Sequence, residues 1–516
     1  MIRPLLLGSL LSLSAAALAQ GDAPVPNRTS AEARTQAAIQ RIEVLNPRLN
    51  AVIAVDPTAL DQARALDRIR RARGPLFGMP ILIKDNIETA GPLPTTAGSL
   101  ALANNVTGRD APLVAGLRAA GAVIVGKANL SEWANIRSSD SISGWSAIGG
   151  QVRNPYALNR NPCGSSSGSA VAVASGMVPA AIGTETDGSI TCPAAVNGIV
   201  GFKPTVGLVS RTHVVPISHS QDTPGPMTVT VRDAALIMNA IAGSDPADAA
   251  TAEAEARRVD YAAALRPDAL RGVRLGVMRF SAGFGTDAPF EAALDTLRTQ
   301  GAVLVEIREF QGNRQELGRA EIAVLLAELK HDLNAYLATL PDSVRTRTLE
   351  QLIAFNVANR ASEMPLFTQD LFEQAQATEG LNDAYRAARA TSLRIAGEDG
   401  IDRMLREHDV AALVAPTRPA AWLIDSVHGD TSPGGGPAGS LAAVAGYPHL
   451  TVPMGEVRGL PVGLSFIGAK WDDARILALG HAYEQASRAR FEPRLLPSIE
   501  ESDDVAPHLR PHQPAR

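Results

Sequence analysis

Short apolar segments alternate with longer amphipathic segments through the first part of the chain. Runs of four to six apolar or β-branched residues between turn residues predict buried strands, and Ala-rich runs with charged residues predict helices. The expected strands are residues 80–83, 122–125, 177–182 and 199–202, and the expected helices are residues 31–44, 58–73, 113–120 and 169–175. Short strands that alternate with helices are typical of an α/β fold built on a layered sheet.

A different pattern begins in the second half of the chain. Between residues 315 and 408 apolar positions recur every three or four residues, as at Ile322 and Leu325, which predicts a helical insert. Strand character returns at residues 410–415 and at residues 450–453. We therefore expect the last part of the chain to rejoin the sheet that the first part begins.

Two further segments have the composition of a loop and a tail. Residues 431–439 are rich in Gly and Pro and predict a loop. Residues 500–516 are polar and contain Pro, which predicts a disordered tail.

The composition narrows the class of protein. The chain has 516 residues, 45% hydrophobic and 20% charged, which is ordinary for a globular protein with one large core or two smaller ones. A net charge of -5 lacks the basic excess that phosphate binding requires, and 4% aromatic residues offer few platforms for base stacking. We therefore expect no nucleic-acid partner.

The first residues have the composition of an export signal. Arg3 precedes an apolar run at residues 5–18, and Ala17-Leu18-Ala19 is a small-x-small cleavage site. The run is too short for a membrane span, so no stable membrane insertion is expected. A buried N-terminal helix is the alternative. We favour a signal peptide over residues 1–19, cleaved near Ala19, and a periplasmic or secreted mature chain.

Gly164-Ser165-Ser166-Ser167-Gly168 is the densest unusual segment. It matches the G-x-S-x-G nucleophile elbow, with Ser166 at its centre. An elbow needs an acid and a histidine downstream, and the nine histidines of this chain are scattered. A flexible linker is the other alternative, but a linker is not expected between a strand and a small-residue helix.

Two other segments carry possible chemistry. Residues 183–189 end a predicted strand in a tight turn, after which a Ser begins a predicted helix, so consecutive backbone N–H groups can point at one developing oxyanion. An ordinary helix N-cap is the alternative. Lys84 ends an apolar strand and is one of only five lysines among 48 basic residues. It either extends to the surface or is buried with a lowered pKa and serves as a base.

These three segments together resemble the amidase signature family of serine hydrolases, which use a Ser-Ser-Lys triad without histidine. The matching residues are Lys84 in Ile83-Lys84-Asp85-Asn86, Ser165 in the Ser/Gly segment and Ser189 in Asp187-Gly188-Ser189, with the serines 24 residues apart. The resemblance extends over residues 31–493. It implies a single large α/β domain in which a mixed β-sheet core is covered by helices on both faces.

The resemblance also implies a role for each matching residue. Ser189 is the nucleophile, Ser165 relays its proton, and a neutral Lys84 is the base, while Ser166 is a supporting residue. The backbone N–H groups expected to bind the oxyanion are those of Thr186, Asp187, Gly188 and Ser189. The peptide bond before Ser165 is expected to be cis. No cofactor and no metal ion are expected.

Within the family, the chain is similar in particular to bacterial peptide amidases, at residues 129–135, 141–146 and 218–226. This likeness implies hydrolysis of the C-terminal amide of peptides with release of ammonia. The alternatives are a glutaminase-type subunit of a tRNA-dependent amidotransferase, which works inside the cell, and an amidase for fatty or aryl amides. A peptide substrate implies that the insert covers a groove. Leu366 and Phe367 either line this groove or pack in the hydrophobic core.

Cys163 and Cys192 are the only cysteines. They are too few for a disulfide scaffold and have no neighbouring His pairs for a zinc site. The thiols lie near each other if Ser165 and Ser189 are in contact. Disulfide geometry is demanding, however, and the resemblance implies that the alignment of the catalytic residues fixes both loops. We therefore expect two buried free thiols.

Overall fold

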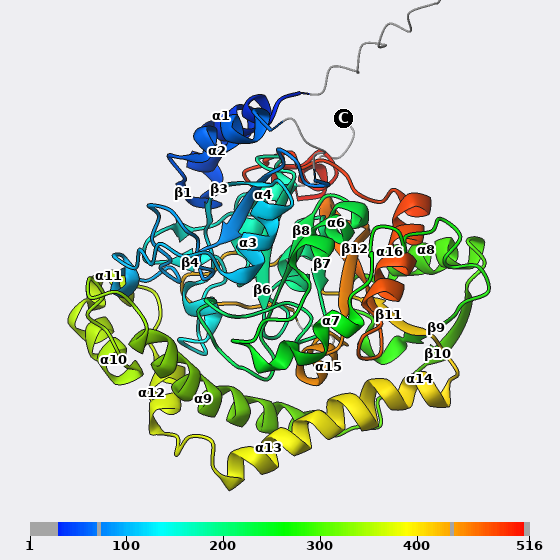
Figure 1. Cartoon of the computed structure of the whole chain (residues 1–516). Coiled ribbons are helices and arrows are strands. Elements are labelled where there is room, and N and C mark those ends of the chain that lie inside the picture. Colours follow the sequence, from blue (N-terminus) through cyan, green and yellow to red (C-terminus); the bar gives the residue numbers. More distant parts are fainter. Residues whose placement is uncertain (1–28, 70–73, 434–437, 510–516) are drawn as a thin grey trace, which may run out of the picture.

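The computed structural model describes residues 29–69, 74–433 and 438–509. One eleven-stranded sheet crosses the molecule in the order β1-β3-β2-β6-β8-β7-β12-β13-β11-β9-β10, and β4 and β5 form a separate pair (Figure 1). The strands are β1 Val52–Val55, β2 Pro80–Lys84, β3 Val123–Ala128, β4 Trp145–Ser146, β5 Gly150–Gln151, β6 Ala180–Glu185, β7 Val200–Lys203, β8 Thr223–Thr228, β9 Arg274–Met278, β10 Val303–Ile307, β11 Ala412–Pro416, β12 His449–Val457 and β13 Leu460–Ile467.

The sheet is mixed, as predicted. Strand β2 runs parallel to both β3 and β6, whereas β6 and β8 are antiparallel. Strands β11, β12 and β13 come from the end of the chain and lie inside the same sheet. The prediction that the last part of the chain rejoins the sheet is therefore confirmed.

The helices cover the sheet and form the insert. They are α1 Ala31–Leu49, α2 Ala59–Asp67, α3 Pro112–Ala119, α4 Ser167–Ala174, α5 Thr191–Val196, α6 Val231–Ile241, α7 Ala254–Arg257, α8 Asp287–Thr299, α9 Arg314–Ala338, α10 Leu349–Ala358, α11 Arg360–Glu363, α12 Asp370–Ala377, α13 Asp383–Leu393, α14 Arg403–Glu407, α15 Ala438–Ala445 and α16 Asp473–Ser487. The short 3-10 elements are η1 Leu100–Leu102, η2 Glu132–Asn135, η3 Ala249–Glu253, η4 Arg279–Ser281, η6 Ile499–Glu501 and η7 Ala506–Leu509, and η5 Arg394–Asp402 is π-helical.

Both faces of the sheet are packed. Along β2, Ile81 and Ile83 contribute to a core that includes residues of α3, α6, α8 and α16. Leu82, between them, contributes to a second core with residues of α1, α2, α4 and α5. Because successive strand side chains point to opposite faces, one apolar run supplies both cores.

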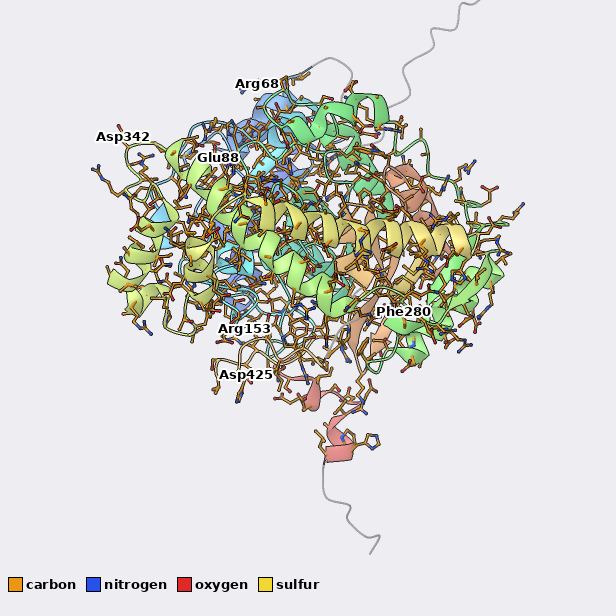
Figure 2. All side chains as sticks on the ribbon, turned by 90° about the horizontal axis from the view of Figure 1, so that it is seen from below. Arg68, Glu88, Arg153, Phe280, Asp342 and Asp425 are labelled. Atoms are coloured by element: carbon orange, nitrogen blue, oxygen red, sulfur yellow. A yellow bond between two sulfur atoms is a disulfide. The ribbon has the colours of Figure 1, made fainter. Side chains whose placement is uncertain are left out.

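The helical insert lies between β10 and β11 and extends from α9 to α14. Its long helices run along the lower side of the molecule in Figure 1, and α9 and α13 lie side by side in the view from below (Figure 2). A separate hydrophobic cluster joins α9, α10 and α12 to residues of the loops after β2, β3 and β7. The insert is therefore packed onto the body of the domain.

Two sequence predictions concern the ends of the chain, a signal peptide and a disordered tail. The predicted signal peptide lies outside the described residues. Where the sequence predicts a disordered tail, the structure describes residues 500–509, in which η6 ends, η7 forms and Glu500 pairs with Arg160. Residues 510–516 lie outside the described part. Within the described chain, no helix combines the length and apolarity that crossing a membrane requires.

Candidate active site

Lys84 lies at the carboxyl end of β2 and is fully buried. Its Nζ lies 2.7 Å from Ser165 Oγ, 2.8 Å from Thr184 Oγ1 and 3.4 Å from the Thr184 carbonyl oxygen. Burial lowers the pKa of Lys84 to about 7, although the nearby charges of Asp222 and Glu185 oppose the shift. Of the two alternatives for Lys84, the structure shows the buried one.

The peptide bond between Gly164 and Ser165 is cis, as the resemblance implied. Gly164 approaches the neighbouring loop so closely that a Cβ there would lie 2.1 Å from Ser131 Oγ. The backbone N–H of Ser131 also donates to the Ser165 carbonyl at 3.0 Å. The loop therefore requires glycine at position 164, and its neighbours hold Ser165 in place.

Ser166 is hydrogen-bonded to β6 and to Ser189. Its hydroxyl donates to the Thr184 carbonyl at 3.1 Å and accepts from the Thr184 N–H at 3.2 Å. Its backbone N–H donates to the Ser189 carbonyl at 3.1 Å. Both side-chain partners are backbone groups and neither is a histidine, which removes the basis for the nucleophile elbow.

Ser189 lies in the turn between β6 and α5. The Glu185 carboxylate accepts from the N–H groups of Ile190 at 2.8 Å and Thr191 at 2.9 Å, which fixes the start of α5. Gly188 has a φ of 79°, a left-handed conformation that favours glycine. A backbone turn, rather than a conventional N-cap by Ser189, therefore presents this serine.

The backbone N–H groups of residues 186–189 have no hydrogen-bond acceptor among the described residues. Thr186 Oγ1 donates to Asp222 at 2.6 Å, and Asp222 also accepts the N–H groups of Ile217 and Ser218. Burial raises the pKa of Asp222 to about 6. Asp222 thus fixes the loop through the Thr186 side chain, while the backbone N–H groups of the loop stay available. Fixed and available N–H donors are what oxyanion stabilisation requires.

A cavity of about 340 Å³ opens beside Ser189. Its wall includes Gly164, Asp187, Ser189, Arg418 and Trp422, and α9 of the insert adds Leu325. The hydroxyl oxygens of Ser189 and Ser165 share no hydrogen bond in the part of the chain that the structure describes. Lys84 thus contacts the Ser165 hydroxyl directly. Ser189 is linked to the same serine loop through its backbone carbonyl, which accepts from Ser166.

The insert reaches the site at a second point. Gln221 Nε2 donates to Glu321 Oε1 of α9 at 3.1 Å and to the Thr186 carbonyl at 3.2 Å. Burial and the neighbouring Asp187 carboxyl raise the pKa of Glu321 to about 8. Gln221 therefore connects the insert to the loop that carries Thr186, Asp187 and Ser189 in the cavity wall.

The two residues named for the groove do not line this cavity. Leu366 is exposed, and Phe367 is buried with its ring edge-on to Trp145 at a centroid distance of 5.2 Å. Phe367 therefore takes the core alternative, while Leu325 is the apolar side chain that the insert supplies.

The expectation of two free thiols is wrong. Cys163 and Cys192 form a disulfide, with their Cα atoms 6.0 Å apart. The hydrogen bond from Ser166 to Ser189 draws the two loops together, and that spacing lies within the range that a disulfide needs. The two fixed loops therefore hold the cysteines at a distance that allows the disulfide, contrary to the expectation.

Three residues of the site were not predicted individually from the sequence. Thr184, Asp222 and Gln221 are polar residues of a strand and a loop, and their contacts with Lys84 and Thr186 exist only in the folded chain. The available signal was their position within residues 183–189 and 218–226, two segments that the sequence marks.

Comparison with known proteins gives consistent results. A family model described as "Amidase" matches residues 33–477. A probable amidase of Arabidopsis thaliana is 39% identical over 470 residues, which cover 89% of this chain and 87% of that protein. A glutamyl-tRNA(Gln) amidotransferase subunit of Roseiflexus castenholzii is 37% identical over 88% of this chain and 92% of its own length. The crystal structure of native peptide amidase from Stenotrophomonas maltophilia is 51% identical, with a TM-score of 0.85 over 90% of this chain and 96% of that one.

Proposed function

The chain belongs to the amidase signature family and hydrolyses amide C–N bonds, and from this premise we propose that its substrates are peptides that end in a carboxamide. The observation that carries the proposal is the 51% identity with a peptide amidase over 90% of the chain. The insert residue Leu325 in the cavity wall adds support, because remote contacts of this kind can hold more of a substrate than its amide.

We assign the attack on the substrate carbonyl to Ser189. As the new oxygen–carbon bond forms, Ser189 Oγ gives its proton to Ser165 Oγ. Ser165 passes its own proton to Lys84 across the 2.7 Å contact. The negative charge then resides on the former carbonyl oxygen, which the N–H groups of residues 186–189 bind.

Lys84 has the hydrogen-bond partners that a neutral amine needs. A neutral amine has two N–H donors and one lone pair. In the neutral form, the two oxygens of Thr184 accept both N–H donors and the lone pair is left for the Ser165 hydroxyl, whereas the protonated form donates to all three oxygens. At a pKa of about 7, a large fraction of Lys84 is neutral at physiological pH.

The second half of the reaction reverses the relay. Protonated Lys84 returns its proton through Ser165 to the nitrogen of the tetrahedral intermediate, the C–N bond breaks, and ammonia leaves. Water then attacks the acyl-enzyme on Ser189 and gives its proton to Lys84 by the same route. Lys84 returns this proton through Ser165 to Ser189 Oγ as the bond between Oγ and the acyl carbon breaks, and the carboxylic acid is released. No cofactor takes part in this sequence.

A glutaminase-type subunit of an amidotransferase is the second candidate. The 37% identity with the Roseiflexus castenholzii protein favours it. Such a subunit would release ammonia from glutamine, so glutamine as a substrate separates the two candidates.

We further propose that the enzyme works in the periplasm or the medium. The composition of residues 1–19 supports export. The Cys163–Cys192 disulfide supports it independently, because disulfides persist in oxidising compartments.

The experiment that tests the substrate is ammonia release by the purified enzyme. Amidated di- and tripeptides, the same peptides with a free carboxyl terminus, glutamine and a long-chain fatty amide are compared at equal concentration. We expect ammonia from the amidated peptides above all others. A preference for glutamine or for the fatty amide would replace the proposed substrate.

A further inference from the structure

Two histidines and an aspartate meet on the surface where the loop before β8 contacts the insert. His219 belongs to the loop, and His331 and Asp332 belong to α9. The side chains of His219 and His331 are 43% and 58% exposed, whereas that of Asp332 is 13% exposed. Solvent thus reaches both imidazoles, while the carboxylate between them is largely covered.

One nitrogen of each histidine faces the same carboxylate. His219 Nδ1 lies 2.9 Å from Asp332 Oδ2, and His331 Nδ1 lies 2.8 Å from Asp332 Oδ1. One donor atom from each residue lies within 4.8 Å of the other two. Tetrahedral zinc with bonds of about 2.1 Å needs donors about 3.4 Å apart, so a small rotation of the exposed imidazoles brings the set together.

A second carboxylate holds the other nitrogen of His219. Glu328 is fully buried, and its Oε1 lies 3.2 Å from His219 Nε2. Glu328 is itself fixed, since it accepts from the Tyr385 hydroxyl at 2.6 Å and the Ser220 hydroxyl at 2.5 Å. His219 Nε2 also shares a hydrogen bond with the Tyr385 hydroxyl at 3.3 Å. Because these partners engage Nε2, Nδ1 is the nitrogen left as a ligand, and the outer contacts orient the ring as in carboxylate–histidine–zinc arrangements.

We propose that His219, His331 and Asp332 bind a divalent transition-metal ion, with Zn²⁺ as the representative ligand. Two imidazole nitrogens and one carboxylate oxygen suit zinc, nickel or copper, whereas magnesium and calcium prefer sites made of oxygen atoms alone. The ion binds between the imidazoles and Asp332, and each ligating ring nitrogen gives up any proton it carries. Water completes its coordination on the exposed side.

Such an ion ties the insert to the active-site loop. The loop that carries His219 continues into Gln221 and Asp222, which contact Thr186. The bound metal therefore stabilises the contact between α9 and this loop and takes no part in the chemistry at Ser189. The site is independent of which amide the enzyme hydrolyses.

Isothermal titration of tag-free, chelator-treated enzyme with zinc chloride tests the proposal, with magnesium chloride as the second titrant. His331→Ala and His219→Ala each remove one ligand from an exposed position. His428→Ala is the matched control, because exposed His428 also pairs with a single carboxylate, that of Asp425, at 2.9 Å.

We expect one Zn²⁺ per chain in the wild type and in His428→Ala, at least a tenfold weaker affinity in both other variants, and no magnesium binding. Zinc should also raise the Tm of the wild type but not that of His331→Ala. Equal zinc affinity in all variants, equal weakening in His428→Ala, or magnesium binding as tight as zinc binding would each overturn the proposal.

Discussion

The side-chain nitrogen of Lys84 lies 2.7 Å from the hydroxyl oxygen of Ser165, although 81 residues separate them in the chain. Strands β2 and β6 are parallel neighbours, so Lys84 and Thr184 come to the same edge of the sheet. Thr184 then holds both Lys84 and Ser166, which places the serine loop over the lysine. This shared residue explains how distant segments form one proton-transfer path.

Replacement of the nucleophile should abolish the reaction. In Ser189→Ala we expect kcat to fall by roughly 10⁴-fold or more and labelling by a fluorophosphonate to disappear, because the attacking hydroxyl is lost and the neighbouring Thr186 hydroxyl donates to Asp222. Mass spectrometry of the labelled protein measures this. Ser166→Ala is the matched control and should keep its label, while losing about 1–3 kcal/mol of unfolding free energy with its bonds to Thr184. A label on Ser166 in Ser189→Ala would restore the elbow interpretation.

Lys84→Arg should be as inactive as Lys84→Ala. Arginine keeps the positive charge but cannot give up a proton near neutrality, so the relay from Ser165 has no acceptor. We expect kcat to fall by roughly 10²–10⁴-fold in both variants. Steady-state kinetics on an amidated dipeptide, with circular dichroism to check folding, decide the matter. An active Lys84→Arg enzyme would exclude Lys84 as the base.

The rate should depend on pH through Lys84. Its pKa is lowered to about 7, so the amine is neutral above this pH and protonated below it. Since only the neutral form accepts a proton, kcat/KM should be constant above pH 7 and fall about tenfold for each unit below it. A pH profile with one amidated dipeptide measures the acid limb. A limb at the ordinary pKa of lysine would mean that burial does not shift this group in the free enzyme.

The alternation of strands and helices sufficed to predict the layered sheet and the insert, because apolar spacing directly reflects burial. The contact between Lys84 and Ser165 followed only from a family resemblance, since no local pattern records which strands pair. Neither the apolar spacing nor the family resemblance predicts the cluster of His219 and His331. Its members are 112 residues apart and become neighbours only when α9 packs against the loop before β8.

The cysteines show the same limit in a different form. The spacing of Cys163 and Cys192 relative to the two serines indicated proximity correctly. Whether neighbouring thiols form a bond depends on the distance between the two Cα atoms, here 6.0 Å, which cannot be read from the sequence.

The disulfide itself can be tested by mass. Denatured wild-type enzyme should take up no alkylating groups without reductant and two after reduction, because both thiols are bonded. The double change Cys163→Ser and Cys192→Ser should lower the free energy of unfolding by about 3 kcal/mol, since the bond closes a loop with a sequence separation of 29. Urea denaturation measures this loss. Two alkylations without reductant would contradict the bond.

Substrate choice should depend on the insert through Leu325. Amidated di- and tripeptides should have a higher kcat/KM than acetamide, because contacts away from the carbonyl position it beside Ser189. Leu325→Ala removes apolar contact from the cavity wall, so kcat/KM for a tripeptide amide should fall roughly fivefold to thirtyfold, while that for acetamide should hardly change. Ile322→Ala, on the same helix but 37% exposed, is the control and should leave both substrates unaffected. An equal loss for tripeptide amide and acetamide in Leu325→Ala would show that the insert shapes the catalytic loops rather than the peptide site. Cleavage of peptides that lack a terminal amide would rule out a peptide amidase, because that activity breaks only the C–N bond of the terminal carboxamide, with ammonia as the leaving group.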